Sequence, residues 1–239
     1  MSDTNGIERA LVVVAHPDDV DFGNAGTIAQ WTRSGIEVSY CIITDGAAGG
    51  RDKDVSREEM ARLRQLEQRA AGECVGVEDI TFLGYPDGRL IVTLDLRRDI
   101  TRVIRQKRPQ RVLCQSPERA WNRIYASHPD HLAAAEATLC AVYPDARNPF
   151  AHPELLEEEG LEEHVVGETW LTTPNEADRF IDITDTFDLK LAALRCHVTQ
   201  VGHMDDLEGR IREWGTRVAE TAGLGDGRLA EAYRVVDTG

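Results

Sequence analysis

Ala10-Leu-Val-Val-Val-Ala15, followed at once by His16-Pro-Asp-Asp-Val-Asp21, gives the clearest indication of the fold in this sequence. Its first half is a continuous apolar run rich in β-branched residues, which is typical of a strand buried on both faces of a parallel sheet. Its second half places a histidine and three aspartates directly behind that strand. Because ligands bind beyond the carboxyl ends of such strands, the stretch predicts a polar site at that edge of the sheet.

Strand-like and helix-like segments alternate through the rest of the chain. The sequence predicts further strands over residues 37–43, 79–83, 111–115, 168–173 and 179–183. It predicts helices over residues 26–33, 56–76, 94–108, 131–142, 188–198 and 206–222, the second opened by a capping box at Ser56-Arg-Glu-Glu59. This alternation predicts an α/β, Rossmann-like fold with a mostly parallel central sheet flanked by helices on both faces. The length suits a single domain over residues 1–239.

Three segments interrupt the regular pattern. Residues 144–167 are rich in Pro and Glu and lack a sustained period, so we expect a surface excursion, either part of a lid or a plain solvated loop. Gly23 and Gly26 are expected to let the backbone turn between the polar site and the first helix. The glycine-rich turn over residues 44–50 is expected either to line a pocket or to be a flexible turn.

Composition excludes several classes of function. The formal net charge is −15, which repels phosphate backbones and anionic lipid surfaces, so no nucleic-acid or membrane partner is expected. The N-terminus is polar and the apolar runs are short, so we expect a cytoplasmic protein without a membrane anchor. The five cysteines are scattered without a C-x-x-C pair and fit reduced thiols; they are Cys41, Cys74, Cys114, Cys140 and Cys196.

A second polar segment, Ser127-His-Pro-Asp-His131, follows another predicted buried strand and a loop. His-Pro-Asp thus occurs twice, each time beyond a strand of the same sheet. His16 and Asp19 are three residues apart, as are His128 and His131, so each pair can face one point in a first helical turn. Two imidazoles and one carboxylate with an open position are a common catalytic zinc set. Spacing alone does not tell the adjacent carboxylates Asp18 and Asp19 apart.

Other interpretations of these residues remain open at this stage. Asp130 lies three residues after Ser127 and could be the acidic half of a capping box. Two histidines and a carboxylate also suit Fe(II), which would give a non-heme iron enzyme. A third alternative is a catalytically inactive ligand-binding α/β protein. The remaining histidines in polar surroundings are expected at the surface; they are His152, His164 and His203.

The motifs together resemble those of a known family. The two signatures and the segments between them are similar to those of the PIG-L (LmbE-like) N-deacetylases, and the resemblance runs from about Leu11 to Gln200. The residues that carry it are Ala15-His-Pro-Asp-Asp19, Phe22-Gly23, Gly26-Thr27, Thr44-x-Gly46-x-x-Gly49, Arg64-x-x-Glu67, Leu83-Gly-Tyr-Pro-Asp87-Gly88, His128-Pro-Asp-His131 and His197-Val-Thr-Gln200.

The resemblance implies zinc-dependent hydrolysis of an N-acetyl group on a small N-acetylglucosamine-type sugar conjugate, with Zn2+ (or Fe2+) as cofactor. It implies that His16, Asp19 and His131 hold the metal. Asp18 would be the general base and His128 the general acid or oxyanion stabiliser. The remaining roles that it implies are positioning of His128 by Asp130 and binding of sugar hydroxyls by Arg64 and Asp87.

The resemblance also has implications for the oligomeric state and for the branch of the family to which the chain is similar. Since relatives form hexamers or smaller assemblies, it allows a homo-oligomer. The absence of a long apolar segment disfavours the membrane-bound eukaryotic branch. One departure is Ala126-Ser127 in place of the Tyr-Gly pair that mycothiol-pathway members carry before the second motif, with Tyr125 one position earlier. This departure weighs against that pathway and against a role for Tyr125 at the oxyanion.

Overall fold

The structure, a computed structural model, describes residues 6–121, 123–172 and 175–239. Its strands are β1 (Arg9–Val14), β2 (Glu37–Thr44), β3 (Ile80–Tyr85), β4 (Arg111–Gln115), β5 (Glu168–Thr172), β6 (Arg179–Asp182) and β7 (Ala230–Asp237). Its α-helices are α1 (Asp19–Arg33), α2 (Arg57–Cys74), α3 (Leu94–Lys107), α4 (Pro129–Cys140), α5 (Pro153–Glu157), α6 (Phe187–Cys196), α7 (Val198–Val201) and α8 (Leu207–Thr221). Single turns of other helix types cover Ile124–Ser127, Ala141–Asp145 and Thr184–Thr186.

The strands form one sheet in the order β3-β2-β1-β4-β5-β7-β6. The pairings from β3 to β5 are parallel, whereas β7 runs antiparallel to both β5 and β6. The predicted mostly parallel sheet is confirmed, with β7 as an addition that the sequence did not reveal. This strand was not predicted because a glutamate, Glu231, suggests an exposed segment. In the structure its carboxylate is buried and forms an ion pair with Lys190 at 2.6 Å.

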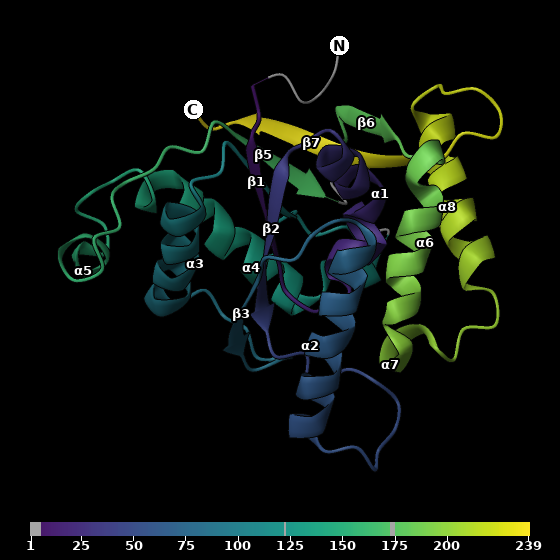
Figure 1. The fold of residues 1–239 in the computed structure, drawn as a ribbon, viewed down its shortest axis with the longest axis horizontal. Coiled ribbons are helices and arrows are strands. Elements are labelled where there is room, and N and C mark those ends of the chain that lie inside the picture. The colour runs from purple at the N-terminus through teal and green to yellow at the C-terminus, as the bar shows by residue number, and fades with distance from the viewer. Residues whose placement is uncertain (1–5, 122, 173–174) are drawn as a thin grey trace.

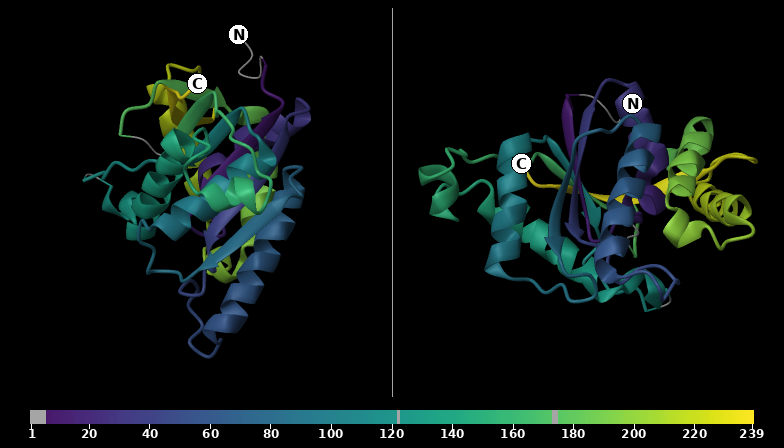
Figure 2. Two further views of the ribbon diagram at one scale, coloured as in Figure 1. Left: turned by 90° about the vertical axis from the view of Figure 1, so that its left-hand side faces the viewer. Right: turned by 60° about the horizontal axis from the view of Figure 1, so that its bottom comes forward.

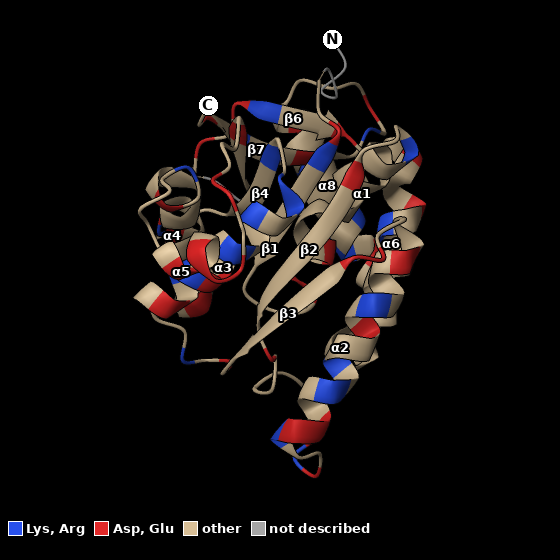
Figure 3. Cartoon of the chain, turned by 60° about the vertical axis from the view of Figure 1, so that its left-hand side comes forward, with Lys and Arg blue, Asp and Glu red and all other residues tan. Residues whose placement is uncertain are grey.

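Alternating side chains of the strands bury both faces of the sheet. Val12 and Val14 of β1 pack into the core formed with α1, α2, α6 and α8, while Leu11 and Val13 pack with α3 and α4. Figures 1 and 2 show these two groups of helices on opposite sides of the sheet. Figure 3 shows that β2 and β3 carry almost no charge, whereas the helices around them carry acidic and basic residues. The continuous apolar strands therefore form the middle layer of a three-layer fold.

The strand order reverses beside β1, and this fixes the place of the polar segments. From β1 the chain continues to β2 on one side, whereas β4 pairs with β1 on the other side. Loops that follow the carboxyl ends of β1, β2, β3 and β4 consequently meet at one edge of the sheet. Residues 16–18, 45–56, 86–93, 116–121 and 123–128 lie in or near these loops.

The two glycines behind the first polar segment do not form a turn, so that expectation was wrong. Both lie inside α1, which begins at Asp19. A Cβ atom at Gly26 would lie 2.7 Å from the Cβ of Ile183, and one at Gly23 would lie 3.1 Å from Oγ1 of Thr172. Because these glycines have no side chain, α1 can pack closely against the end of β5 and the residue that follows β6.

Residues 144–167 are held along α3 and do not form a lid. The Arg105 guanidinium donates hydrogen bonds to carbonyl oxygens of Asp145 and Asn148, and Arg97 forms an ion pair with Asp145 at 2.7 Å. None of the hydrogen bonds found for this segment in the described ranges reaches the polar segments after β1 and β4. His152 and His164 belong to this segment and are partly buried, because their rings contact Asp145 and the carbonyl oxygen of Pro109. His203 is exposed, as predicted. None of the helices in the described part of the chain has the length and hydrophobicity needed to cross a bilayer.

Candidate metal centre

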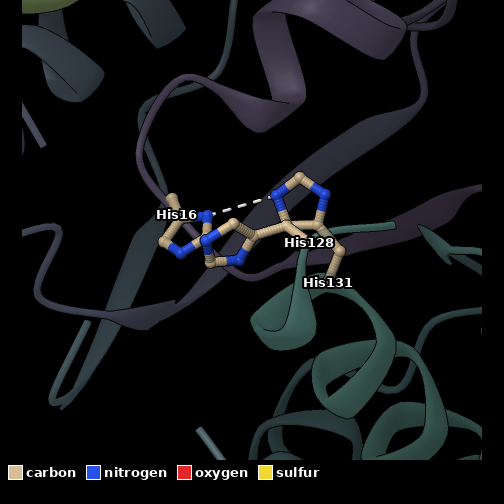
Figure 4. A group of neighbouring side chains, drawn as sticks. All are labelled: His16, His128 and His131. Atoms are coloured by element: carbon tan, nitrogen blue, oxygen red, sulfur yellow. Dashed lines mark hydrogen bonds between the residues drawn. The ribbon is translucent and has the colours of Figure 1, made fainter. Parts of the chain in front are cut away.

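The two polar segments flank the ends of two helices and converge on one point. His16 follows β1, and Asp19 is the first residue of α1. His128 is the N-cap of α4, and His131 lies in its first turn. In Figure 4 the three imidazoles point toward one another from these two elements, although they are more than 110 residues apart in the chain.

Three of these side chains present metal-binding atoms to each other. Nδ1 of His16 lies 3.2 Å from Nε2 of His131 and 3.2 Å from Oδ2 of Asp19. Nε2 of His131 lies 3.1 Å from Oδ1 of Asp19. Ligand atoms around a tetrahedral zinc ion are roughly 3.4 Å apart when each is about 2.0–2.1 Å from the metal. The spacing and the donor types therefore fit a divalent transition metal.

The other ring nitrogen of His16 fixes which of its atoms is free to bind. Nε2 lies 3.1 Å from Oδ1 of Asp87 and 3.2 Å from Oδ2 of Asp130. An ionised carboxylate can only accept, so Nε2 carries a proton. When a metal ion takes the place of the second ring proton, the lone pair of Nδ1 faces His131 and Asp19. This is the carboxylate–histidine arrangement that orients metal-binding imidazoles in proteins.

Charge around His16 also favours a cation. Burial alone would lower the pKa of His16, but the carboxylates of Asp19, Asp130 and Asp87 outweigh it and raise that pKa to about 12. Either a proton or a metal ion can supply the positive charge that these carboxylates stabilise.

Asp130 does not hold His128, in contrast to the role expected from the sequence. Its carboxylate accepts hydrogen bonds from the backbone N–H groups of Gly88 (2.7 Å) and Leu90 (3.1 Å) and faces His16. Only its backbone N–H meets His128, by donating to Nδ1 at 3.2 Å. The capping box also does not form, because His128 caps α4 while the Ser127 hydroxyl accepts from the N–H of Ala120.

Asp18, which lies between His16 and Asp19 in the chain, has a strained backbone conformation. Its φ of 91° lies in the left-handed region, which costs a non-glycine residue about 1–3 kcal/mol. Two side chains of α2 hold it there: Gln68 accepts its backbone N–H at 2.8 Å, and the Arg64 guanidinium lies 3.2 Å from its carboxylate. Burial raises the pKa of Asp18 to about 6, although the Arg64 charge acts in the opposite direction.

Arg64 and Asp87 do not face open solvent, so the expected grip on sugar hydroxyls is not what the structure shows. Arg64 is only 3% exposed and donates to the carbonyl oxygens of Pro17 and Gly46. Asp87 is 6% exposed and accepts from the N–H of Ala48 at 2.9 Å as well as facing His16. Both residues position the loops around the site. Gly46 and Gly49 of the glycine-rich turn lie against the Arg64 guanidinium, which fixes this turn beside the site.

His128 stands beside the candidate ligands and is partly exposed. Its ring centroid lies 4.9 Å from that of His16 and 5.3 Å from that of His131. Partial burial and these two imidazoles lower the pKa of His128, which favours a neutral ring. Because Nδ1 accepts the N–H of Asp130, the proton of the neutral ring lies on Nε2.

Sequence reasoning missed three supporting residues. Gln115, the last residue of β4, donates from Nε2 to Asp19 at 3.0 Å and accepts the N–H of Ala15 at 3.0 Å. Asp21 is fully buried and accepts from Gln68 (2.9 Å) and His197 (2.8 Å). Asp21 belongs to the first polar segment, and His197 begins the motif His197-Val-Thr-Gln200. The presence of a polar residue in each of these motifs was the only feature of the sequence that could have indicated this contact. The Tyr125 side chain lies outside the described part of the structure.

An open cleft of about 550 Å³ adjoins this cluster. Asp19, Gln115 and His131 line it together with residues of α8. A substrate group can therefore reach the candidate metal ligands from solvent.

Comparison with known proteins agrees with this geometry. Residues 11–142 match the model of the PIG-L family, described as GlcNAc-PI de-N-acetylase. The chain belongs to the PIG-L family. This PIG-L family member is 35% identical to diacetylchitobiose deacetylase of Thermococcus kodakarensis, over 82% of the chain and 71% of that protein.

Two further relatives support the assignment. A probable N-acetyl-alpha-D-glucosaminyl L-malate deacetylase 2 of Bacillus cereus is 31% identical to the PIG-L family member, over 85% of this chain and 89% of that protein. The solved structure of N,N'-diacetylchitobiose deacetylase from Pyrococcus horikoshii with its inhibitor MPG superimposes with a TM-score of 0.89 at 28% identity. That similarity covers 98% of this chain and 86% of the other.

Proposed function

We propose that the chain is a zinc-dependent N-deacetylase that hydrolyses the acetamide of a small N-acetylglucosamine-type conjugate, with residues 1–239 acting as one deacetylase domain. The observation that carries this proposal is the convergence of His16 Nδ1, His131 Nε2 and the Asp19 carboxylate within 3.2 Å of one another. Family membership and the names of the relatives, which are glucosaminyl deacetylases, support the substrate class.

His16, Asp19 and His131 would hold the metal. When bound, zinc polarises a carbonyl group and lowers the pKa of a water molecule. The balanced reaction consumes one water and yields acetate and a free amine.

Asp18 is the proposed general base. It lies next to a ligand in sequence, and its strained backbone is held by two side chains of α2, so its carboxylate is fixed in place. It accepts a proton from the attacking water and returns it to the leaving amine nitrogen.

His128 is the proposed oxyanion donor. Its ring is neutral with the proton on Nε2, so this atom can donate a hydrogen bond to the carbonyl oxygen as negative charge develops there. Asp130 and Asp87 act one step further out, because they hold the proton of His16 Nε2 and thereby orient the lone pair of Nδ1.

Two alternatives share part of this geometry. Fe(II) accepts the same two imidazoles and carboxylate, so metal identity separates zinc hydrolysis from non-heme iron chemistry. An inactive binding protein has no need of a strained, buried carboxylate beside a metal site.

The test uses metal-free protein reloaded with zinc or, anaerobically, with Fe(II). We expect the zinc-loaded protein to release free amine from members of a panel of N-acetylglucosamine conjugates, detected with an amine-reactive dye, without oxygen uptake. His131→Ala should lose the metal, as measured by elemental analysis, whereas His203→Ala at an exposed position should keep it. Absence of amine release from every conjugate by zinc-loaded protein would overturn the proposal.

A further inference from the structure

The cleft beside the candidate metal centre extends to α8, whose residues the hydrolytic proposal does not use. Arg210, Trp214 and Arg217 line it and stand at i, i+4 and i+7, which places them on one face of the helix. Neighbouring Leu207 and Ile211 are buried against the core, so the helix is anchored and its cleft-facing side chains have a fixed base. Figure 1 shows α8 beside α6, on the face of the sheet that α1 also covers.

Charge in this cleft is opposite to that of the chain as a whole. The formal net charge is −15, yet the charged side chains that line the cleft, apart from the proposed ligands Asp19 and His131, are the arginines Arg123, Arg210 and Arg217. Arg217 makes one exposed contact with Glu213 at 3.3 Å, and Arg210 has no ion pair among the described residues. A concave site lined by one sign of charge concentrates ligands of the other sign.

Trp214 adds a flat apolar surface between these arginines. Its indole is half-buried and lies near Phe22 and Ile211 in the cleft wall. An indole face is suited to stack against the apolar face of a ring while polar groups at its edge meet charged side chains. Candidate metal ligands, an aromatic surface and arginines thus line one and the same cleft.

We propose that this cleft binds a conjugate whose aglycone carries a carboxylate or phosphate, and that Arg210 and Arg217 recognise that anion. The inference rests on the proposed deacetylase function for the position of the acetamide. It goes further by assigning charge to the other end of the substrate. Arginine guanidinium groups form charge-assisted hydrogen bonds with both carboxylates and phosphates.

The experiment compares charged and neutral probes of similar size. The anionic probes are the carboxymethyl glycoside of N-acetylglucosamine and N-acetylglucosamine 1-phosphate, which separate carboxylate from phosphate recognition. The neutral probes are the matching carboxamide glycoside and the methyl glycoside. Amine release gives kcat/KM on zinc-loaded protein, and calorimetry on zinc-loaded Asp18→Asn protein gives Kd without turnover.

We expect at least one anionic probe to exceed its neutral counterpart by about 10-fold or more in kcat/KM and in 1/Kd, the scale of one charge-assisted hydrogen bond. In the double variant Arg210→Gln with Arg217→Gln this preference should fall to near unity. The control is Arg212→Gln on the same helix. Its guanidinium stacks over Phe187 and pairs with Glu208, away from the cleft, so the preference should remain.

The outcomes separate this inference from the proposed function. No amine release from any probe, with the anionic preference in Kd intact and lost in the double variant, would refute the deacetylase and leave the anion site standing. Equal kcat/KM and equal Kd for charged and neutral probes would overturn the anion site. A preference that survives in the double variant, or no measurable binding of any probe, would overturn it as well.

Discussion

Replacement of Asp18 by asparagine separates its proposed chemistry from its structural role. Asparagine has nearly the same shape and, among non-glycine residues, tolerates the left-handed φ of 91° well. Its amide oxygen can still face the Arg64 guanidinium, and the backbone N–H can still donate to Gln68. The variant thus removes the capacity to take a proton while leaving the loop in place.

The expected magnitudes follow from these contacts. Loss of a positioned base lowers kcat by on the order of 10²-fold or more, equivalent to about 2.7 kcal/mol at about 1.36 kcal/mol per tenfold change. The free energy of unfolding should fall by at most about 1 kcal/mol, because burial already disfavours the ionised Asp18 carboxylate and because Arg64 keeps Asp87 at 3.6 Å and two carbonyl acceptors. For a chain of this size that corresponds to a Tm lower by at most roughly 2–4 °C.

The assay requires metal content, activity and stability on the same preparation. Zinc stoichiometry is measured by elemental analysis, amine release by steady-state kinetics, and Tm by calorimetry of the zinc-loaded protein. Asp79→Asn is the matched control, because this aspartate pairs with Lys107 at the opposite edge of the sheet. Full activity of the zinc-loaded Asp18→Asn protein would refute the base assignment, and loss of zinc together with activity would place Asp18 among the ligands.

Three further predictions test other parts of the structure. Asp130→Asn removes a carboxylate that holds the imidazole of the proposed ligand His16, and zinc affinity should fall about 10–100-fold in competition with a chelator, whereas unchanged affinity would refute that positioning role. Burial raises the pKa of Cys41 and of Cys114 to about 12, so at pH 8 both thiols should react with iodoacetamide at least about 10³-fold more slowly in the native than in the unfolded protein, as peptide mapping would show. Gly26→Ala places a methyl group against Ile183 and should destabilise the fold by about 1–3 kcal/mol in denaturant unfolding; an unchanged midpoint would contradict the packing described.

Most of the fold could be predicted from local pattern. The apolar run at β1 is continuous and rich in β-branched residues, and β4 has the apolar centre Val112-Leu-Cys114, so the burial of both strands was visible in the sequence. Ser56 caps α2 by accepting the N–H of Glu59, as its capping box indicated. The strand β7 was missed because the sequence pattern suggests that Glu231 is exposed. Its burial depends on contacts distant in sequence, with Lys190 of α6 and with the backbone N–H groups of Gly26 and Thr27 in α1.

The candidate site, too, could be predicted from the sequence only in part. Spacing brought His16 and His131 to one edge of the sheet, since each follows a buried strand. Spacing could not separate Asp18 from Asp19, because adjacent residues differ only in where the backbone turns them. Backbone strain directs Asp18 toward Arg64, while Asp19 lies in the first turn of α1 against both imidazoles.

The distribution of charge at this edge links the fold to the proposed chemistry. Four carboxylates, from Asp18, Asp19, Asp87 and Asp130, approach the candidate ligands, and Arg64 is the cation that pairs with two of them. With both imidazoles neutral, as metal binding requires, this group has a formal charge of −3, most of it shielded from solvent. Such an excess is costly to bury without compensation, and a divalent cation would reduce it to −1. The carboxylates that hold the histidine therefore also favour metal binding, and a zinc ion at this point would allow Asp18 to stay ionised beside its neighbours, as a base requires.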